Sequence, residues 1–191
     1  DFLIHHLTST GNNDSFLQSQ LDILKKIKHD NIKETAVLSI ARSDYMLDQQ
    51  DNTAYQVEYN TMAASFGGLG TKLNQYHHYI INKYKDSFTT NQINLIKTSN
   101  IPKNNAIYEI ADTLVQAYYL HPAAVIMDNN KNIIPCIVMI VKANESNYCD
   151  QEALELAIYQ QDSNIRVIRR TLQDKFTLNE QGDCLYTIKE L

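Results

Sequence analysis

The segment that most restricts the fold lies near the middle of the chain, where strand periodicity is followed by a glycine-rich stretch and then by helix periodicity. Residues 55–59 alternate in period two, and most of residues 61–70 are small. Apolar residues then recur at helical spacing from Leu73 to Tyr84. A strand, a turn and a helix in succession favour an α/β protein.

Segments of the same two kinds lie on both sides of this unit. The other helices are expected at 15–30, 106–120 and 149–161, with a short helical turn near 93–96. The other strands are expected at 35–40, 123–127, 136–141 and 165–168, with a hairpin around 181–183. The second and third of these strands are either two strands or one interrupted by an insertion. After Pro122 the order strand, helix, strand predicts a right-handed parallel βαβ unit.

The composition indicates a folded protein of one or two domains, since the chain has 191 residues, of which 43% are hydrophobic and 20% charged. The net charge of −5 offers no basic field to attract nucleic acid. Cys136, Cys149 and Cys184 have no C-x-x-C spacing, so neither a disulfide framework nor a zinc site is expected. The longest apolar run, residues 133–141, is too short to span a membrane. We expect a cytoplasmic protein.

Glu58 and Asn60 lie two residues apart on the expected strand, so their side chains project to the same face. A carboxylate and an amide carbonyl side by side offer the hard oxygen ligands that suit Mg²⁺. The small residues that follow let backbone N–H groups at the start of the next helix approach an anion. This two-residue spacing is not a recognised metal-binding motif. The structural alternative is that Glu58 and Asn60 are an ordinary pair on an edge strand and that the glycines only form a turn.

Arg42 comes where the first expected strand ends, a position at which open α/β sheets collect ligands. Its guanidinium is suited to bind a carboxylate through two parallel hydrogen bonds. Asp44 follows two residues later, and a local ion pair between Arg42 and Asp44 explains the same residues equally well. The sequence leaves both interpretations open.

Asn147 and Gln151 lie on either side of the start of the helix expected at 149–161, four residues apart and on a shared side. Two side-chain amides in this arrangement can hydrogen-bond one polar ligand. Capping of that helix by Asn147 or Asp150 is the commoner role for such residues. The chain contains no P-loop, dinucleotide fingerprint or serine-hydrolase motif.

Four blocks, in their order along the chain, resemble the eukaryotic type of glutathione synthetase. They read RSDYM at 42–46, QVEYNTMAASFGGL at 56–69, NYCDQ at 147–151 and VIRRT at 167–171. The resemblance spans residues 16–174. The second block is specific, and the order of the other three argues against coincidence.

The resemblance implies part of an ATP-grasp-type ligase, with helices packed on a mixed sheet and a Rossmann-like βαβ substrate-binding unit. Residues 1–121 would be the N-terminal part of the catalytic body, and residues 122–191 an incomplete substrate-binding α/β domain. The implied reaction joins γ-glutamylcysteine to glycine with ATP, through an acyl phosphate, and gives glutathione, ADP and phosphate. Such chemistry depends on positioning and charge neutralisation, which agrees with the absence of a catalytic triad.

Carried over residue by residue, the resemblance implies two sets of binding residues and no protein nucleophile. Glu58 and Asn60 would help bind Mg²⁺ between the phosphates of ATP, and Met46 would lie near the nucleotide. The γ-glutamylcysteine substrate would be held by Arg42, Ser65, Asn147 and Gln151.

The chain departs from the family pattern in three places. Ala63 replaces a serine that is common in the family, and residues 128–135 look like an insertion. The sequence ends at Leu191, before the family's F-R-D-G-Y-type segment, its ATP-grasp lysines and its glycine-rich lid. We therefore expect that the remainder of the enzyme lies elsewhere in the same polypeptide, is present as another chain, or is deleted, and we expect no activity from these residues alone.

Two alternatives accompany this interpretation. One is a non-catalytic domain that binds γ-glutamyl peptides, although such a domain has no need of the metal ligands Glu58 and Asn60. The other is a related ligase that joins a different acceptor amino acid, because none of these residues is expected to determine which amino acid is the acceptor. The resemblance also implies a homodimer.

Overall fold

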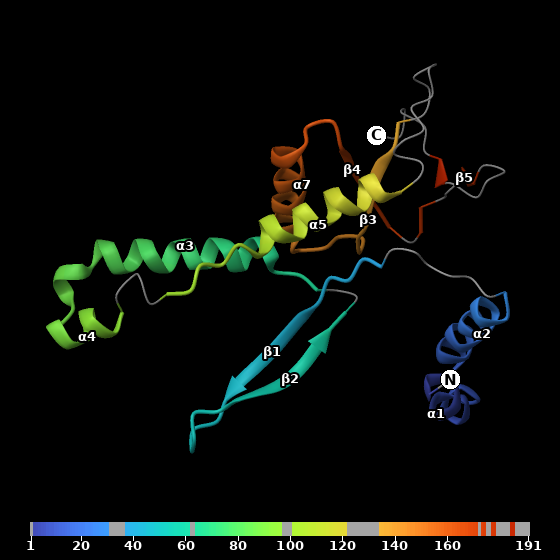
Figure 1. The fold of residues 1–191 in the computed structure, drawn as a ribbon, viewed down its shortest axis with the longest axis horizontal. Helices are drawn as coiled ribbons and strands as arrows, with labels where there is room; N and C mark the ends of the chain where they lie inside the picture. The colour runs from blue at the N-terminus through green and yellow to red at the C-terminus, as the bar shows by residue number, and fades with distance from the viewer. Residues whose placement is uncertain are drawn as a thin grey trace. The chain divides into compact units, whose positions relative to one another are not determined.

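The computed structural model describes residues 2–30, 37–61, 64–96, 101–121, 134–171, 173–174, 177–178 and 184–185 (Figure 1). The chain divides into two compact units, Asp1–Val37 and Leu38–Leu191, and each is described by itself. Helices and small sheets occur together, so the mixed α/β class predicted from the sequence is confirmed. The second unit holds every residue of the expected site.

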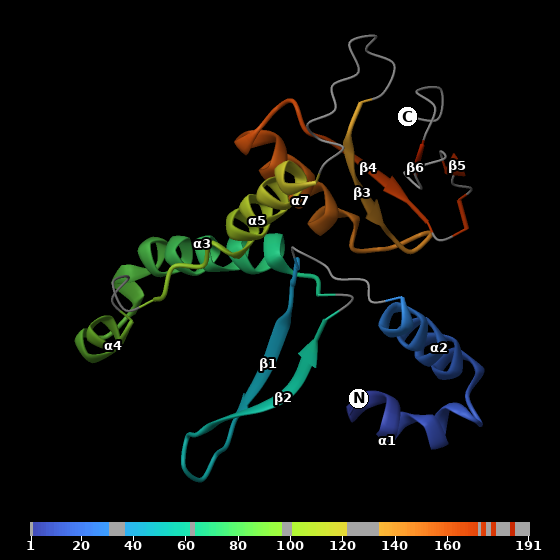
Figure 2. The same ribbon diagram turned by 45° about the vertical axis from the view of Figure 1, so that its right-hand side comes forward.

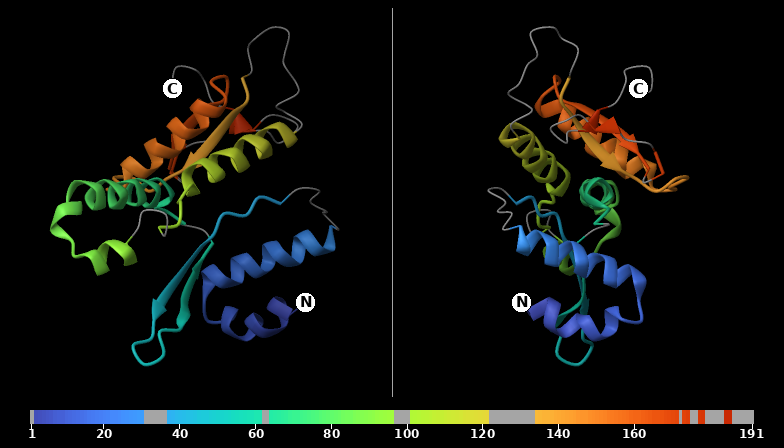
Figure 3. Two further views of the ribbon diagram at one scale, coloured as in Figure 1. Left: turned by 60° about the vertical axis from the view of Figure 1, so that its left-hand side comes forward. Right: turned by 90° about the vertical axis from the view of Figure 1, so that its right-hand side faces the viewer.

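The first unit consists of two helices, α1 (Phe2–Gly11) and α2 (Ser15–His29), which lie side by side (Figure 3). Asp14 caps α2, because its carboxylate accepts hydrogen bonds from two backbone N–H groups of the first turn. Leu21 is buried close to Gly11, where an added Cβ would come within 2.9 Å of the Cδ1 atom of Leu21. The helix predicted at 15–30 is confirmed.

In the second unit, β1 (Arg42–Leu47) and β2 (Ala54–Asn60) form an antiparallel hairpin (Figure 1). The register pairs Arg42 with Asn60 and Asp44 with Glu58, and it shifts between Asp44 and the next residue. The shift leaves Val57 as an extra residue on β2, which is a β-bulge.

The first strand lies later in the chain than the sequence predicted. Residues 37–40 are irregular backbone and residues 35–36 lie outside the described residues, so the strand expected at 35–40 is wrong in its described part. Strand propensity is strongly context-dependent, and a strand forms where a partner accepts its ladder of hydrogen bonds. Here β2 pairs with Arg42–Leu47 instead of with the apolar run before it.

The helix α3 (Gly67–Lys83) follows β2, which confirms the predicted strand and helix, but the glycine-rich turn predicted between them is wrong in part, because Gly67, Gly68 and Gly70 lie in the first turn of α3. Its N-cap residue is Phe66, which has a left-handed backbone (φ 77°, ψ 15°) and makes no capping hydrogen bond with its own side chain. A 3₁₀ turn (Lys85–Ser87) and the short α4 (Thr90–Leu95) follow α3, close to the helical turn expected near 93–96.

The core of the second unit lies where α5 (Ala106–Leu120) and α7 (Tyr148–Gln161) pack together with the parallel strands β3 (Cys136–Ile140) and β4 (Arg166–Arg170) (Figure 2). Its buried residues are Ile107, Ala111, Ala157, Ile158 and Ile165. Because β3, α7 and β4 follow one another and the two strands are parallel, they form the predicted βαβ unit.

A buried threonine joins α3 to the start of α5. Thr71 is 3% exposed, and its hydroxyl donates to Oδ1 of Asn104 at 3.3 Å and accepts from the N–H of Ile107 at 3.4 Å. Oδ1 of Asn104 also accepts from the N–H of Ala106 at 3.0 Å. Two backbone N–H groups that α5 cannot satisfy internally are thus capped by side chains.

A short antiparallel pair, β5 (Thr177–Leu178) and β6 (Cys184–Leu185), confirms the hairpin predicted near the end of the chain. The turn of that hairpin and the run at 123–127 lie outside the described residues. Among the described helices none is long and apolar enough to cross a membrane. The functional division expected between residues 121 and 122 is not tested by this arrangement and stays a prediction.

Candidate functional site

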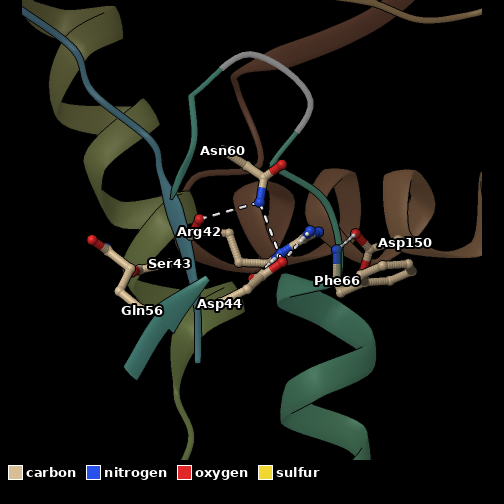
Figure 4. A network of polar contacts seen from close by, with 7 residues as sticks. All are labelled: Arg42, Ser43, Asp44, Gln56, Asn60, Phe66 and Asp150. Carbon is tan, nitrogen blue, oxygen red and sulfur yellow. Dashed lines mark hydrogen bonds and ion pairs between the residues drawn. The ribbon is translucent and has the colours of Figure 1, made fainter. Parts of the chain in front are cut away.

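Four polar side chains gather on one face of the β1–β2 hairpin. Arg42 and Asp44 lie two residues apart on β1, and Glu58 and Asn60 lie opposite them on β2. We call these four residues the hairpin cluster; Figure 4 shows three of them, Arg42, Asp44 and Asn60, from close by. The structure thus brings together three of the residues predicted to bind substrate or metal, and their roles stay predictions.

Arg42 and Asp44 form the local ion pair that the sequence left open. Nε of Arg42 donates to Oδ1 of Asp44 at 2.7 Å, and Nη2 donates to Oδ2 at 2.9 Å. These hydrogen bonds are the main reason that the pKa of Asp44 is lowered and the pKa of Arg42 is raised. The pairing uses one edge of the guanidinium, which leaves the edge that carries Nη1 for another acceptor.

Asn60 lies between this ion pair and Glu58 and can present its amide in two orientations. In the first, Nδ2 donates to the carbonyl of Arg42 at 3.4 Å and to Oδ2 of Asp44 at 3.3 Å, and Oδ1 faces Glu58. In the second, Nδ2 donates to Oε1 of Glu58 at 2.6 Å, and Oδ1 accepts from Nη2 of Arg42 at 3.1 Å. Without a bound cation, the hydrogen bonds favour the second orientation. A cation between Oδ1 of Asn60 and Oε1 of Glu58 would favour the first.

The donor set of Glu58 and Asn60 fits part of a magnesium shell. Both offer hard oxygen atoms, and Mg²⁺ is usually held by one or two protein carboxylates together with water and substrate phosphates. Among the described residues no group of three or more His, Cys, Asp or Glu side chains could hold a metal ion by itself. A magnesium ion bound here would therefore take its remaining ligands from phosphates and water.

Phe66 connects the hairpin cluster to the start of α3. The guanidinium carbon of Arg42 lies 5.5 Å from the centre of the Phe66 ring, which is within the range of a cation–π interaction. The ring reaches this place from a left-handed backbone, a conformation that aromatic residues rarely adopt.

Asp150, from the first turn of α7, holds this unusual backbone (Figure 4). Its Oδ2 accepts from the N–H of Phe66 at 2.7 Å, and its Oδ1 accepts from the N–H of Leu69 at 3.0 Å. Asp150 therefore caps α3, and the sequence-based alternative that it caps its own helix is wrong. No local signal could reveal this role, because the two partners are separated by 84 and 81 residues.

Gly68 permits this approach of α7 to α3. A Cβ atom at Gly68 would lie 2.7 Å from Cβ of Ala153 and 2.9 Å from Oδ1 of Asp150, both shorter than van der Waals contact allows. Gly67 is similarly crowded, since a Cβ there would lie 2.9 Å from Cδ1 of Ile110 on α5. Gly68 is thus required by helix packing, because the Cβ of Ala153 is fixed to its backbone, whereas at Gly67 the end of the Ile110 side chain can shift.

The remaining expected site residues lie at the two helix N-termini or along β1. Ser65 is half-buried in the loop that enters α3. Asn147 is the N-cap residue of α7, which confirms the position that the capping alternative gave it, although its side chain makes no capping hydrogen bond. Gln151 is half-buried in the same helix. Met46 is exposed on β1, beyond the hairpin cluster, and Ala63 lies outside the described residues.

An open hollow of about 670 Å³ lies elsewhere, between α3 and α5. The residues that line it carry polar groups and include Asn74, Lys103, Glu109 and Asp112. None of the predicted site residues lines it. We therefore place the candidate site at the hairpin cluster and the N-terminal ends of α3 and α7, where the predicted residues converge.

Comparison with known proteins relates nearly the whole chain to one family. Residues 1–190 match the family model described as the ATP-binding domain of eukaryotic glutathione synthase. The chain is 35% identical over 175 residues to the chloroplastic glutathione synthetase of Arabidopsis thaliana, covering 91% of this chain and 29% of that protein. It is 30% identical over 184 residues to glutathione synthetase of Homo sapiens, covering 95% of this chain and 34% of that protein. The chain thus spans about a third of the length of these curated relatives.

Proposed function

The chain belongs to the eukaryotic glutathione synthase family, and from this premise we propose that it supplies part of the active site of an ATP-dependent ligase. In the proposed reaction, the cysteinyl carboxylate of γ-glutamylcysteine attacks the terminal phosphorus of ATP, and ADP leaves. The amine of glycine then attacks the acyl phosphate, loses a proton and displaces phosphate, which gives glutathione. The family description supports the nucleotide, and the name of the relatives supports the product.

The observation that carries the proposal is the hairpin cluster. It combines an arginine suited to a substrate carboxylate with a carboxylate and an amide suited to a metal ion, all on one face of a hairpin. Transfer of a phosphoryl group to a carboxylate brings two anions together, so the site needs positive charge beside both. The hairpin cluster would meet this requirement with Arg42 beside the substrate carboxylate and with a magnesium ion, held by Glu58 and Asn60, beside the phosphates.

We propose that Glu58 and Asn60 hold Mg²⁺ at the phosphates of ATP. The exposed carboxylate of Glu58 and the amide of Asn60 are adjacent. Rotation of the amide from the second orientation to the first would bring Oδ1 of Asn60 beside Oε1 of Glu58, so that both oxygens could bind one ion. When bound, magnesium would neutralise charge on the transferring phosphoryl group. Met46, on the same hairpin, is proposed to lie near the nucleotide.

Arg42 is proposed to bind a carboxylate of γ-glutamylcysteine through the Nη1 edge of its guanidinium. Asp44 holds the opposite edge by two hydrogen bonds, so the plane of the guanidinium is set before substrate arrives. Ser65, Asn147 and Gln151 would hydrogen-bond the rest of the dipeptide from the two helix N-termini. Their hydroxyl and amide groups suit its polar, zwitterionic ends.

Four further features stay predictions. The parallel βαβ unit supports a Rossmann-like substrate-binding domain within an ATP-grasp body. The homodimer, the cytoplasmic location and the inactivity of these residues on their own rest on the sequence.

The test is to express the full-length protein encoded by the gene and to measure phosphate release with γ-glutamylcysteine, glycine and MgATP. We expect release only when all three are present, with glutathione as the product. Binding of γ-glutamylcysteine without ATP hydrolysis would favour the non-catalytic domain. Turnover with an amino acid other than glycine, but not with glycine, would favour the related ligase.

A further inference from the structure

Asp150 is the described residue that physically joins the two parts of the proposed dipeptide site. It stands in α7 between Asn147 and Gln151, and its carboxylate holds the backbone of Phe66, the residue after Ser65. We propose that Asp150 is a positioning residue for γ-glutamylcysteine, which sets the loop that carries Ser65 against the N-terminus of α7. This inference rests on the proposed function.

Both oxygens of the carboxylate are needed for this role. Oδ2 accepts from the N–H of Phe66 at 2.7 Å and Oδ1 from the N–H of Leu69 at 3.0 Å, so each oxygen satisfies one N–H at the start of α3. The negative charge also lies at the positive end of the α3 dipole. Phe66 occupies the N-cap position of α3, but its side chain has no hydrogen-bond acceptor. The carboxylate of Asp150 from α7 serves as the cap instead.

The carboxylate also acts on Arg42 through Phe66. The left-handed backbone of Phe66 (φ 77°) is unfavourable for an aromatic residue and persists because its N–H is held. In that conformation the ring lies 5.5 Å from the guanidinium carbon of Arg42. A chain of contacts therefore runs from α7 through Phe66 to the proposed carboxylate-binding arginine, and Ser65 moves with it.

Among the described contacts, Glu58 and Asn60 touch neither Asp150 nor Phe66 and reach this chain only through Arg42, so losing the carboxylate should affect the dipeptide much more than the nucleotide. Asp150→Asn has nearly the same shape but only one acceptor oxygen, and its NH₂ group faces an N–H that needs an acceptor. In the full-length protein we expect the KM for γ-glutamylcysteine to rise about tenfold or more, with the KM for ATP within about twofold of wild type. Hydrogen exchange at the amides of Phe66 and Leu69 should quicken about tenfold.

The matched control is Asp162→Asn, which removes a carboxylate at the other end of the same helix. Asp162 accepts a hydrogen bond from Tyr119 of α5 and touches none of the proposed site residues. This variant should leave both KM values unchanged. A selective rise in the dipeptide KM in the control would mean that any loosening of α7 has this effect, and it would overturn the positioning role.

Phe66→Gly provides a second, independent test. Glycine adopts the left-handed conformation without help, so Asp150→Asn should raise the dipeptide KM less in this background than in wild type. Fully additive effects would contradict the inference, as would equal changes in both KM values. If the wild-type protein neither ligates nor binds γ-glutamylcysteine, the proposed function fails and the inference fails with it. If the wild-type protein is active and Asp150→Asn changes the KM values for γ-glutamylcysteine and ATP equally, the positioning role is wrong while the proposed function stands.

Discussion

Replacing Gly68 by alanine tests whether the close packing of α3 on α7 contributes more to stability than the helix propensity of this residue. In an isolated helix the change from glycine to alanine is stabilising by about 0.5–1 kcal/mol, because alanine loses less backbone entropy on folding. In this protein the added Cβ would lie 2.7 Å from Cβ of Ala153 and 2.9 Å from Oδ1 of Asp150. Helix propensity and tertiary packing therefore predict opposite signs.

The packing term should be the larger. Forcing an extra methyl group into a filled site costs about 1–3 kcal/mol, and displacing the Asp150 carboxylate weakens two hydrogen bonds that together contribute on the order of 1 kcal/mol or more. After subtracting the gain in propensity, we expect Gly68→Ala to lower the free energy of unfolding by about 1–3 kcal/mol. Gly68 is buried and its neighbours belong to two helices, so the site has little room to relax.

Gly70→Ala is the matched control in the same helix. A Cβ at Gly70 would meet only the side-chain nitrogen of Asn104, at 3.4 Å, so this variant should be stabilised by about 0.5–1 kcal/mol. Urea denaturation of the full-length variants measures both values. Adding Ala153→Gly to Gly68→Ala should show a favourable coupling energy of about 1 kcal/mol. Equal stabilisation by both alanines, or no coupling to Ala153, would refute the packing argument.

Three more outcomes are expected of the full-length protein. Glu58→Gln should lower kcat about tenfold to a hundredfold at saturating Mg²⁺ with little change in Tm, because Glu58 is exposed; a near-normal rate of phosphate release would rule out the metal role. Arg42→Ala should raise the γ-glutamylcysteine KM at least about tenfold and leave the ATP KM nearly unchanged, whereas equal changes would indicate a structural role. The hydrogen bond from Tyr119 lowers the pKa of Asp162, so its contribution to stability is complete above about pH 4 and is lost as the pH falls through that lowered pKa. The Tm difference between wild type and Asp162→Asn should therefore shrink on acidification, and a constant difference would contradict this.

Features that depend on neighbouring residues could be predicted from the sequence. Helical periodicity placed α5 at 106–120, because the apolar stripe that this helix must bury recurs in consecutive turns, and the helix predicted at 149–161 is α7 (Tyr148–Gln161). Alternation along β2 placed Glu58 and Asn60 on one face, since side chains two apart on a strand project together. The ordered motif blocks indicated the family, and the comparisons confirm it.

Contacts between distant segments could be seen only in the folded structure. The position of β1 depended on which residues β2 pairs with, and apolar composition misplaced it. Arg42 was equally suited to a substrate and to Asp44, and the hairpin geometry was needed to show that one edge of its guanidinium is used within the protein. The capping of α3 by Asp150 joins residues more than eighty positions apart. Such a contact exists because α7 packs on α3 at a glycine, and no local periodicity or spacing records where two helices will meet.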